Sequence, residues 1–431
     1  MWQYGLMHNF KSFGVSFKTL TVNGIDFFSF EKPSAPIFVS VFFHAGSKFN
    51  EKDGAAHFLE HMLSAGSEKF PSKNLLADYI ENTGGEFSLS TNSDFIRIDL
   101  EIAEPQDSPV LVDILDQMVN KSLFNEETFS KEKTSILSEL ANKTSNQKEF
   151  VWEVWRELFF QNTALSQSNL GSEESIKTTM VNDLLLFKNK YFLGGKVSVI
   201  MAGGLQTEKM STDLARVLGE KHTIIQNDTK VPMVREKWFD TEFYPSKLAS
   251  VVFGFRTNTK TLKDEVCAAI CAEYLAGGRA SELITKLRYE RGLVYNVGVI
   301  NRCMQNGSAF AVRTDCEVDN LEQVLSIINK SFQNLHEFAI SEEKLRDLKS
   351  RITKFFIIEL QTSKSWVVNN ERLVVANDGK SIIDFLSAVN EVSVGDIKKY
   401  VQRNFLLEKK YIAACGPEQV AEVIKKFGSN L

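Results

Sequence analysis

The stretch Ile37-Phe-Val-Ser-Val-Phe-Phe43 has the length and the β-branched and aromatic content of a buried strand. A similar apolar run recurs at Leu248–Phe255, in the second half of the chain. Each run is followed by a helical pattern that ends at glycine, the first near Ala65-Gly66 and the second, Asp264–Leu275, at Gly277-Gly278. The matching order predicts that the chain contains two copies of one structural unit.

The rest of the chain extends this repeat. Further matching pairs are Val110–Val119 with Leu321–Leu335, Asn125–Ala141 with Ser341–Ile358, and Val197–Gly203 with Tyr411–Gly416. The pattern predicts an α+β fold with two similar α/β-sandwich domains, each an antiparallel-rich sheet with helices packed on it. We expect the first domain at residues 1–220, a linker at 221–239 and the second domain at 240–431. In the first domain, alternating residues from Glu86 to Ile102 predict one long strand.

The composition excludes several classes of protein. The chain has 431 residues, of which 43% are hydrophobic and 24% charged, as in ordinary globular domains. The net charge is −5 without a basic block, so we expect no nucleic-acid partner. No apolar run reaches the length of a membrane span, and the five cysteines, all in the second half, do not form a disulfide framework. The start resembles neither a secretory nor a transit peptide, so we expect a cytoplasmic protein.

The first expected helix carries the sequence His57-Phe-Leu-Glu60-His61. In a helix, His57 and His61 lie one turn apart on one face, with Glu60 beside them. Two imidazoles at this spacing can bind a divalent metal ion, and the carboxylate can accept a proton from a metal-bound water. The alternative is a surface helix with two ordinary histidines. The second copy has only His336 and no such motif, so one copy alone is expected to hold the site.

A catalytic zinc ion commonly has three protein ligands, so a third ligand is needed. The first half has no cysteine, and its other histidines stand in the N-terminal segment, at a strand end and in the expected linker: His8, His44 and His222. A carboxylate is therefore expected. Glu139 is the best candidate because it flanks the apolar stripe of its helix, and Glu132, seven residues earlier, could orient a ligand. For both residues the alternative is a solvated helix face.

These features together resemble a known family. His57-Phe-Leu-Glu60-His61, followed 78 positions later by Glu139, resembles the motif of the pitrilysin/insulinase family of inverted-motif zinc peptidases. It is most similar to the half-length branch that includes the mitochondrial processing peptidase subunits. The resemblance covers nearly the whole chain and includes Gly84-Gly85, Leu275–Ser281 and Leu287–Tyr295.

The resemblance implies a role for each residue of the motif. His57, His61 and Glu139 would bind one Zn²⁺ per chain, and Glu60 would be the general base that activates a zinc-bound water. Glu132 matches the supporting acidic residue of the family. The expected activity is that of a zinc metalloendopeptidase, a peptide-bond hydrolase.

The resemblance also assigns residues outside the motif. Arg288 and Tyr295 match a pair that contacts substrate and helps to polarise the scissile carbonyl. The residues alone leave open that Arg288 is a cation near a helix end and that Tyr295 is a strand core residue. Ser88-Leu89-Ser90-Thr91 stands where the family usually has Asn-Ala-x-Thr and pairs with the substrate backbone. Leu89 is a departure that would narrow a subsite.

The expected function is hydrolysis of short unfolded peptides inside a dimeric chamber. Half-length relatives work as pairs of chains, and this chain has both the zinc residues and the Arg288–Tyr295 pair. We therefore expect a homodimer, with a heterodimer with a related chain as the alternative. Another class of function remains open, that of a non-catalytic or partner-dependent subunit of a peptidase or respiratory complex.

Overall fold

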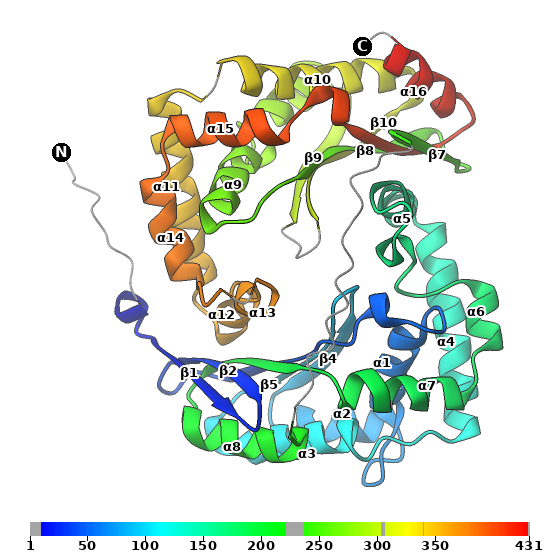
Figure 1. Ribbon diagram of the computed structural model, residues 1–431, viewed down its shortest axis with the longest axis vertical. Helices are drawn as coiled ribbons and strands as arrows, with labels where there is room; N and C mark the ends of the chain where they lie inside the picture. The colour runs from blue at the N-terminus through cyan, green and yellow to red at the C-terminus, as the bar shows by residue number, and fades with distance from the viewer. Residues whose placement is uncertain (1–9, 221–236, 303–306, 339, 377, 430–431) are drawn as a thin grey trace. The chain divides into compact units, whose positions relative to one another are not determined.

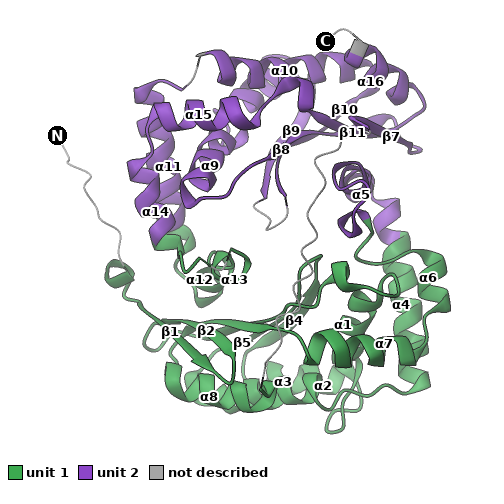
Figure 2. Ribbon diagram, in the orientation of Figure 1, with its two compact units in different colours: residues 1–141, 167–228, 357–383 green, residues 142–166, 229–356, 384–431 purple. Residues whose placement is uncertain are grey.

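The computed structural model describes residues 10–220, 237–302, 307–338, 340–376 and 378–429. The chain forms two compact units, and each unit takes segments from both halves of the sequence (Figure 2). Unit 1 consists of residues 1–141, 167–228 and 357–383, and unit 2 consists of residues 142–166, 229–356 and 384–431. Of the expected linker at 221–239, only the last three residues lie within the described part.

Unit 1 is built on a six-stranded sheet (Figure 1). Its strands, in spatial order, are β1 (Ser16–Val22), β2 (Ile25–Glu31), β6 (Val197–Gly203), β3 (Ile37–Phe43), β5 (Ile96–Ile102) and β4 (Glu86–Thr91). Neighbouring strands are antiparallel except for the parallel pair β2 and β6. Asn23 and Gly24 join β1 to β2 with φ angles of 52° and 75°, the left-handed conformation that a tight hairpin turn requires.

Unit 2 repeats this sheet with one strand fewer. Its order is β7 (Phe239–Phe243), β11 (Tyr411–Gly416), β8 (Leu248–Thr257), β10 (Ser308–Glu317) and β9 (Val294–Arg302). The pair β7 and β11 is parallel, as β2 and β6 are in unit 1, and the other pairs are antiparallel. The equal order and directions confirm the predicted α+β fold with two similar sheet-and-helix domains, and β1 is an addition to unit 1.

The prediction of one long strand from Glu86 to Ile102 is wrong. The segment forms two strands, β4 and β5, which pair with each other around a turn. The side-chain oxygen of Asn92 accepts hydrogen bonds from the backbone N–H groups of Asp94 at 2.7 Å and Phe95 at 2.9 Å. An asparagine that bonds its own following backbone in this way favours a turn over a continuous strand.

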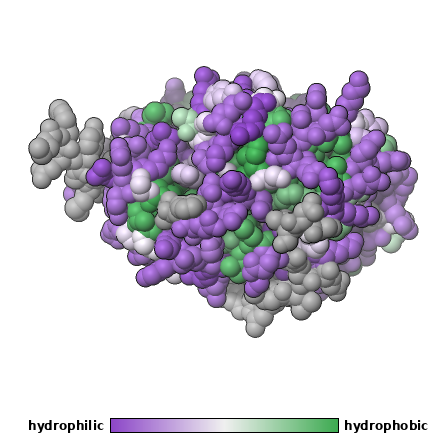
Figure 3. All heavy atoms as spheres, turned by 90° about the horizontal axis from the view of Figure 1, so that it is seen from above, coloured by the Kyte–Doolittle hydropathy of each residue, from purple (hydrophilic) through white to green (hydrophobic). Residues whose placement is uncertain are grey.

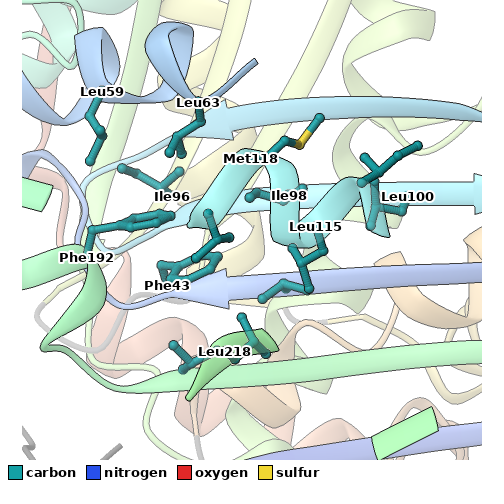
Figure 4. Packing of buried hydrophobic residues seen from close by; sticks show 14 of the residues in the cluster. Phe43, Leu59, Leu63, Ile96, Ile98, Leu100, Leu115, Met118, Phe192 and Leu218 are labelled. Atoms are coloured by element: carbon teal, nitrogen blue, oxygen red, sulfur yellow. The ribbon is translucent and has the colours of Figure 1, made fainter. Parts of the chain in front are cut away.

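Helices cover one face of each sheet and bury the main core. Those of unit 1 include α1 (Ala55–Ala65), α2 (Lys73–Glu81), α3 (Ser108–Val119), α6 (Glu173–Thr178), α7 (Val181–Phe187) and α8 (Thr207–Leu218), together with most of α4 (Glu126–Ser145). Figure 4 shows Leu59 and Leu63 of α1 and Met118 of α3 above strand residues such as Ile98. These residues are fully buried, so the core fixes where α1 lies on the sheet.

The helices of unit 2 follow the same plan. They are α9 (Leu262–Ala276), α10 (Leu321–Phe338), α15 (Val394–Asn404) and α16 (Gln419–Ser429), with α11 (Glu342–Glu359) and α14 (Ile382–Glu391) beside them.

Figure 3 shows one face of the molecule on which hydrophilic side chains predominate. Within the described part of the chain, no helix combines the length and apolar content needed to cross a bilayer.

Each sheet is covered on its second face by a helical segment from the other half of the sequence (Figure 2). Helix α5 (Gln147–Phe159) packs on β7, β8 and β11 of unit 2. Helix α12 (Ser363–Val368), followed by α13 (Arg372–Val375), packs on β2, β3 and β6 of unit 1. The ring of Trp366 in α12 lies 5.4 Å from that of Phe30, centroid to centroid. The two halves of the sequence therefore exchange helices.

Candidate active site

Two contacts fix the start of α1, the helix whose first turn contains His57. Gly54, just before the helix, has φ 83°, and a Cβ atom there would lie 2.7 Å from the carbonyl oxygen of Leu170. Only glycine fits this approach. The side chain of Asn50 accepts a hydrogen bond from the backbone N–H of Ala56 at 2.9 Å and so caps the helix.

Helix α4 is packed against α1 by a pair of aromatic rings. Phe58 of α1 stacks on Phe129 of α4 with centroids 4.7 Å apart and planes 8° from parallel. The side chain of Asn125 caps α4 by accepting a hydrogen bond of 2.9 Å from the backbone N–H of Thr128 in the first turn. From Phe129, Glu132 follows after three residues and Glu139 after ten, so both stay on the side of α4 that meets α1.

Three donor atoms converge between these helices. The Nε2 atom of His57 lies 3.6 Å from Oε2 of Glu139, and Nε2 of His61 lies 3.4 Å from the same oxygen. A tetrahedral zinc ion with bonds of about 2.1 Å separates its ligand atoms by about 3.4 Å. The two distances to Oε2 of Glu139 are close to this separation. Two imidazoles and one carboxylate are also the number and type of ligands that leave one position open in a catalytic zinc site.

Glu132 holds the ring of His61. Its Oε2 atom lies 2.9 Å from Nδ1 of His61, and the two side chains are only 19% and 16% exposed. A hydrogen bond from Nδ1–H leaves the lone pair on Nε2 for a metal ion. Burial acts to lower the pKa of His61, but hydrogen bonds to Glu132 and Glu139 outweigh it and raise the pKa to about 9. A metal ion that binds Nε2 of His61 replaces the proton that this nitrogen carries in the charged imidazolium, and Nδ1–H remains bonded to Glu132.

Glu60 lies beside the donor atoms but is held by a different element. Ligand atoms of His57, Glu60 and His61 lie within 4.8 Å of one another. Oε2 of Glu60 accepts a hydrogen bond of 2.7 Å from the hydroxyl of Thr91, the last residue of β4. Burial raises the pKa of Glu60, and the hydrogen bond from Thr91 opposes that rise. The site thus holds a carboxylate with the placement of a general base.

The stretch Ser88-Leu89-Ser90-Thr91 lies in β4, at the edge of the unit 1 sheet. Ser88 and Ser90 are exposed, whereas Leu89 and Thr91 are half-buried on the opposite face. Within the described residues β5 is the one strand that pairs with β4, so the outer edge offers backbone groups to an added strand. Pairing of a peptide with this edge stays a prediction.

Arg288 and Tyr295 belong to unit 2, whereas the histidines belong to unit 1. Arg288 lies in η6, a π-helical segment (Ile284–Tyr289), and its guanidinium carbon is 4.8 Å from the ring centroid of Tyr295. Tyr295 lies in the edge strand β9 and is 83% exposed. The alternative that Tyr295 is a strand core residue is therefore wrong, and the two side chains form a cation–π pair at a sheet edge.

Other sequence candidates lie elsewhere. His44 is half-buried directly after β3, and its Nε2 atom lies 3.2 Å from the hydroxyl oxygen of Ser198. His8 and His222 fall outside the described residues. Sequence reasoning missed the hydroxyl of Thr91 as a partner of Glu60. The signal was the alternation along β4, which places Thr91 on the same face as Leu89.

Comparison with known proteins gives the family. A model described as insulinase (peptidase family M16) matches residues 30–173, and one described as peptidase M16 inactive domain matches residues 180–352. The chain belongs to peptidase family M16. The first match contains the His57–His61 motif of this M16 chain, and the second covers most of the copy that lacks the motif. Both matches confirm the family resemblance found in the sequence.

Relatives of this M16 chain include zinc proteases and processing peptidases. An uncharacterized zinc protease of Streptomyces coelicolor is 21% identical over 87% of this chain and 83% of its own length. The mitochondrial-processing peptidase subunit beta of Homo sapiens is 22% identical over 91% of this chain and 83% of its own length. These matches span most of each protein, as expected for the half-length branch.

Solved structures share the fold. A protease from Helicobacter pylori superposes with a TM-score of 0.83 at 18% identity, over 94% of this chain and 100% of that one. A peptidase M16 inactive domain from Pseudomonas fluorescens gives a TM-score of 0.80 at 16% identity, over 93% and 98%. At these identities the likeness establishes the fold.

Proposed function

We propose that this M16 chain is a zinc-dependent endopeptidase that hydrolyses short unfolded peptides. The observation that carries the proposal is the convergence of Nε2 of His57, Nε2 of His61 and Oε2 of Glu139 at distances of 3.4 and 3.6 Å. One zinc ion per chain, held by these atoms, would supply a Lewis acid that acidifies water and polarises the scissile carbonyl.

The residues around the donor atoms divide the remaining work. Glu60 accepts the proton of the attacking water and later delivers it to the leaving amine. Glu132 keeps the ring of His61 in the ligating tautomer. The edge of β4 aligns the peptide backbone, and Arg288 and Tyr295 donate hydrogen bonds to the oxygen that becomes negatively charged.

We further propose that the working form is a homodimer. Each chain carries the zinc residues and the Arg288–Tyr295 pair, so two copies can supply two complete sites. An enclosed chamber between chains would admit extended peptides and exclude folded proteins. A cytoplasmic location is part of the proposal and rests on the sequence alone.

A second candidate is a non-catalytic or partner-dependent subunit. It is favoured by the name of a relative, a processing peptidase subunit beta, and by the description of the family model for residues 180–352 as an inactive domain. The complete set of His57, Glu60, His61 and Glu139 favours the peptidase instead, because a subunit without catalysis needs neither three ligands nor a base.

The test is a digest of a peptide library by the purified chain, with and without a zinc chelator, read by mass spectrometry. We expect cleavage that the chelator abolishes and that added zinc restores. No chelator-sensitive cleavage by a chain that contains zinc would reject the peptidase and favour the non-catalytic subunit.

Mixing two inactive variants tests the homodimer. Glu60→Gln removes the base and Arg288→Ala removes the pair, so each variant alone should be inactive. Recovery of part of the activity in the mixture supports sites shared between two chains. Full activity of either single variant would contradict the assigned roles.

A further inference from the structure

The contact between Glu60 and Thr91 joins two elements with different proposed tasks. Glu60 lies in α1, and Thr91 ends β4, the edge strand. The oxygen–oxygen distance of 2.7 Å is that of a short hydrogen bond from a hydroxyl to a carboxylate. Both side chains are half-buried, so water competes weakly for this bond.

The backbone on both sides of Thr91 is firmly held. Thr91 pairs with Ile96 in the hairpin of β4 and β5. The next residue, Asn92, caps the turn with its side chain, and its carbonyl oxygen accepts a hydrogen bond of 2.9 Å from the backbone N–H of Ser47. A Cβ atom at Gly46 would lie 2.4 Å from that same carbonyl oxygen, so the two segments are in close contact. The hydroxyl of Thr91 is therefore presented from a rigid point.

A glutamate side chain has three rotatable bonds, and a general base must hold its oxygen within about 3 Å of the proton it accepts. A carboxylate offers about four lone-pair positions, so the single bond from Thr91 leaves others for a water proton. Holding one oxygen of Glu60 from β4 restricts the rotation of the carboxylate without blocking it.

We infer that Thr91 is a positioning residue, whose hydroxyl orients the carboxylate of Glu60 and ties the base to the strand that aligns the peptide. The inference rests on the proposed peptidase function. Thr91 is also the last residue of the β4 edge. A peptide that pairs with this edge is therefore connected to Glu60 through Thr91 alone, which fixes the distance between the peptide and the base. Side-chain hydrogen bonding and backbone pairing then act on the same transition state.

The experiment compares Thr91→Val, which keeps the volume and strand preference, with Thr91→Ser, which keeps the hydroxyl. For Thr91→Val we expect kcat to fall about 10- to 100-fold, the effect of losing a hydrogen bond to a charged group, with KM and zinc content within about twofold of wild type. Thr91→Ser should restore kcat to within about threefold of wild type. Thr19→Val, the same change at an exposed position of edge strand β1, serves as control and should leave kcat unchanged.

The outcomes separate this inference from the proposed function. If the wild-type chain shows no chelator-sensitive cleavage, the proposed function itself fails. If wild type cleaves and Thr91→Val has the same kcat, only the role of Thr91 is rejected. The role is also rejected if kcat falls in proportion to lost zinc or lost folded protein, or if Thr91→Ser is as slow as Thr91→Val.

Discussion

Replacing Glu132 should weaken zinc binding although Glu132 is not one of the three converging donors. Its Oε2 atom lies 2.9 Å from Nδ1 of His61, and both side chains are less than a fifth exposed, so solvent screens the bond little. A hydrogen bond to a charged group contributes about 1.5–3 kcal/mol, which corresponds to about 10- to 150-fold in affinity. Glu132→Ala should weaken zinc affinity by a factor near the upper end of this range. Glu132→Gln, whose amide oxygen still accepts a weaker hydrogen bond from His61, should weaken zinc affinity by about tenfold, near the lower end of the range.

The assay is competition for zinc between the purified chain and a chelating dye, with kcat measured on the zinc-loaded form. Glu127→Gln is the matched control, because Glu127 lies in the same helix, is 80% exposed and pairs with the exposed Lys131. It should change the zinc Kd by less than about twofold. A wild-type Kd for Glu132→Ala, or an equal loss in the control, would refute the reasoning.

Three other perturbations test the proposed base Glu60, the half-buried His44 and the exchanged helix α12. Glu60→Gln should lower kcat by about 10²- to 10⁴-fold with zinc content unchanged; a zinc-loaded variant that cleaves at the wild-type rate would remove Glu60 from the mechanism. Burial lowers the pKa of His44 from 6.5 to about 4, so the unfolded chain takes up the proton first, and stability should decline by about 3 kcal/mol as the pH falls from 6.5 to 4. When the free energy of unfolding is measured in urea at several pH values, His44→Gln should lose less stability than wild type between pH 6.5 and 4. An equal loss of stability in both proteins would contradict this. Trp366→Ala should cost unit 1 about 3–5 kcal/mol and speed limited proteolysis within residues 10–220; new cleavage confined to residues 240–338 would count against the exchange.

Much of the fold could be predicted because its signals are local. The apolar runs Ile37–Phe43 and Leu248–Phe255 became β3 and β8, the corresponding strands of the two sheets. The alternation from Glu86 to Ile102 was misread, because a hairpin with a polar turn keeps the same period as a continuous strand. The hydrogen bonds of the Asn92 side chain, which end β4, decided between the two.

By itself the sequence determined the duplication and the motif His57-Phe-Leu-Glu60-His61, because the spacing of residues along one helix is a property of the local chain. Only the tertiary structure brought Glu139 to within 3.6 Å of both histidines and Thr91 to Glu60, because packing such as Phe58 on Phe129 sets the distance between elements. It also decided that α5 and α12 pack on the sheet of the opposite half. An apolar helix face is equally well buried on either sheet, so the choice depends on the packing of the whole chain.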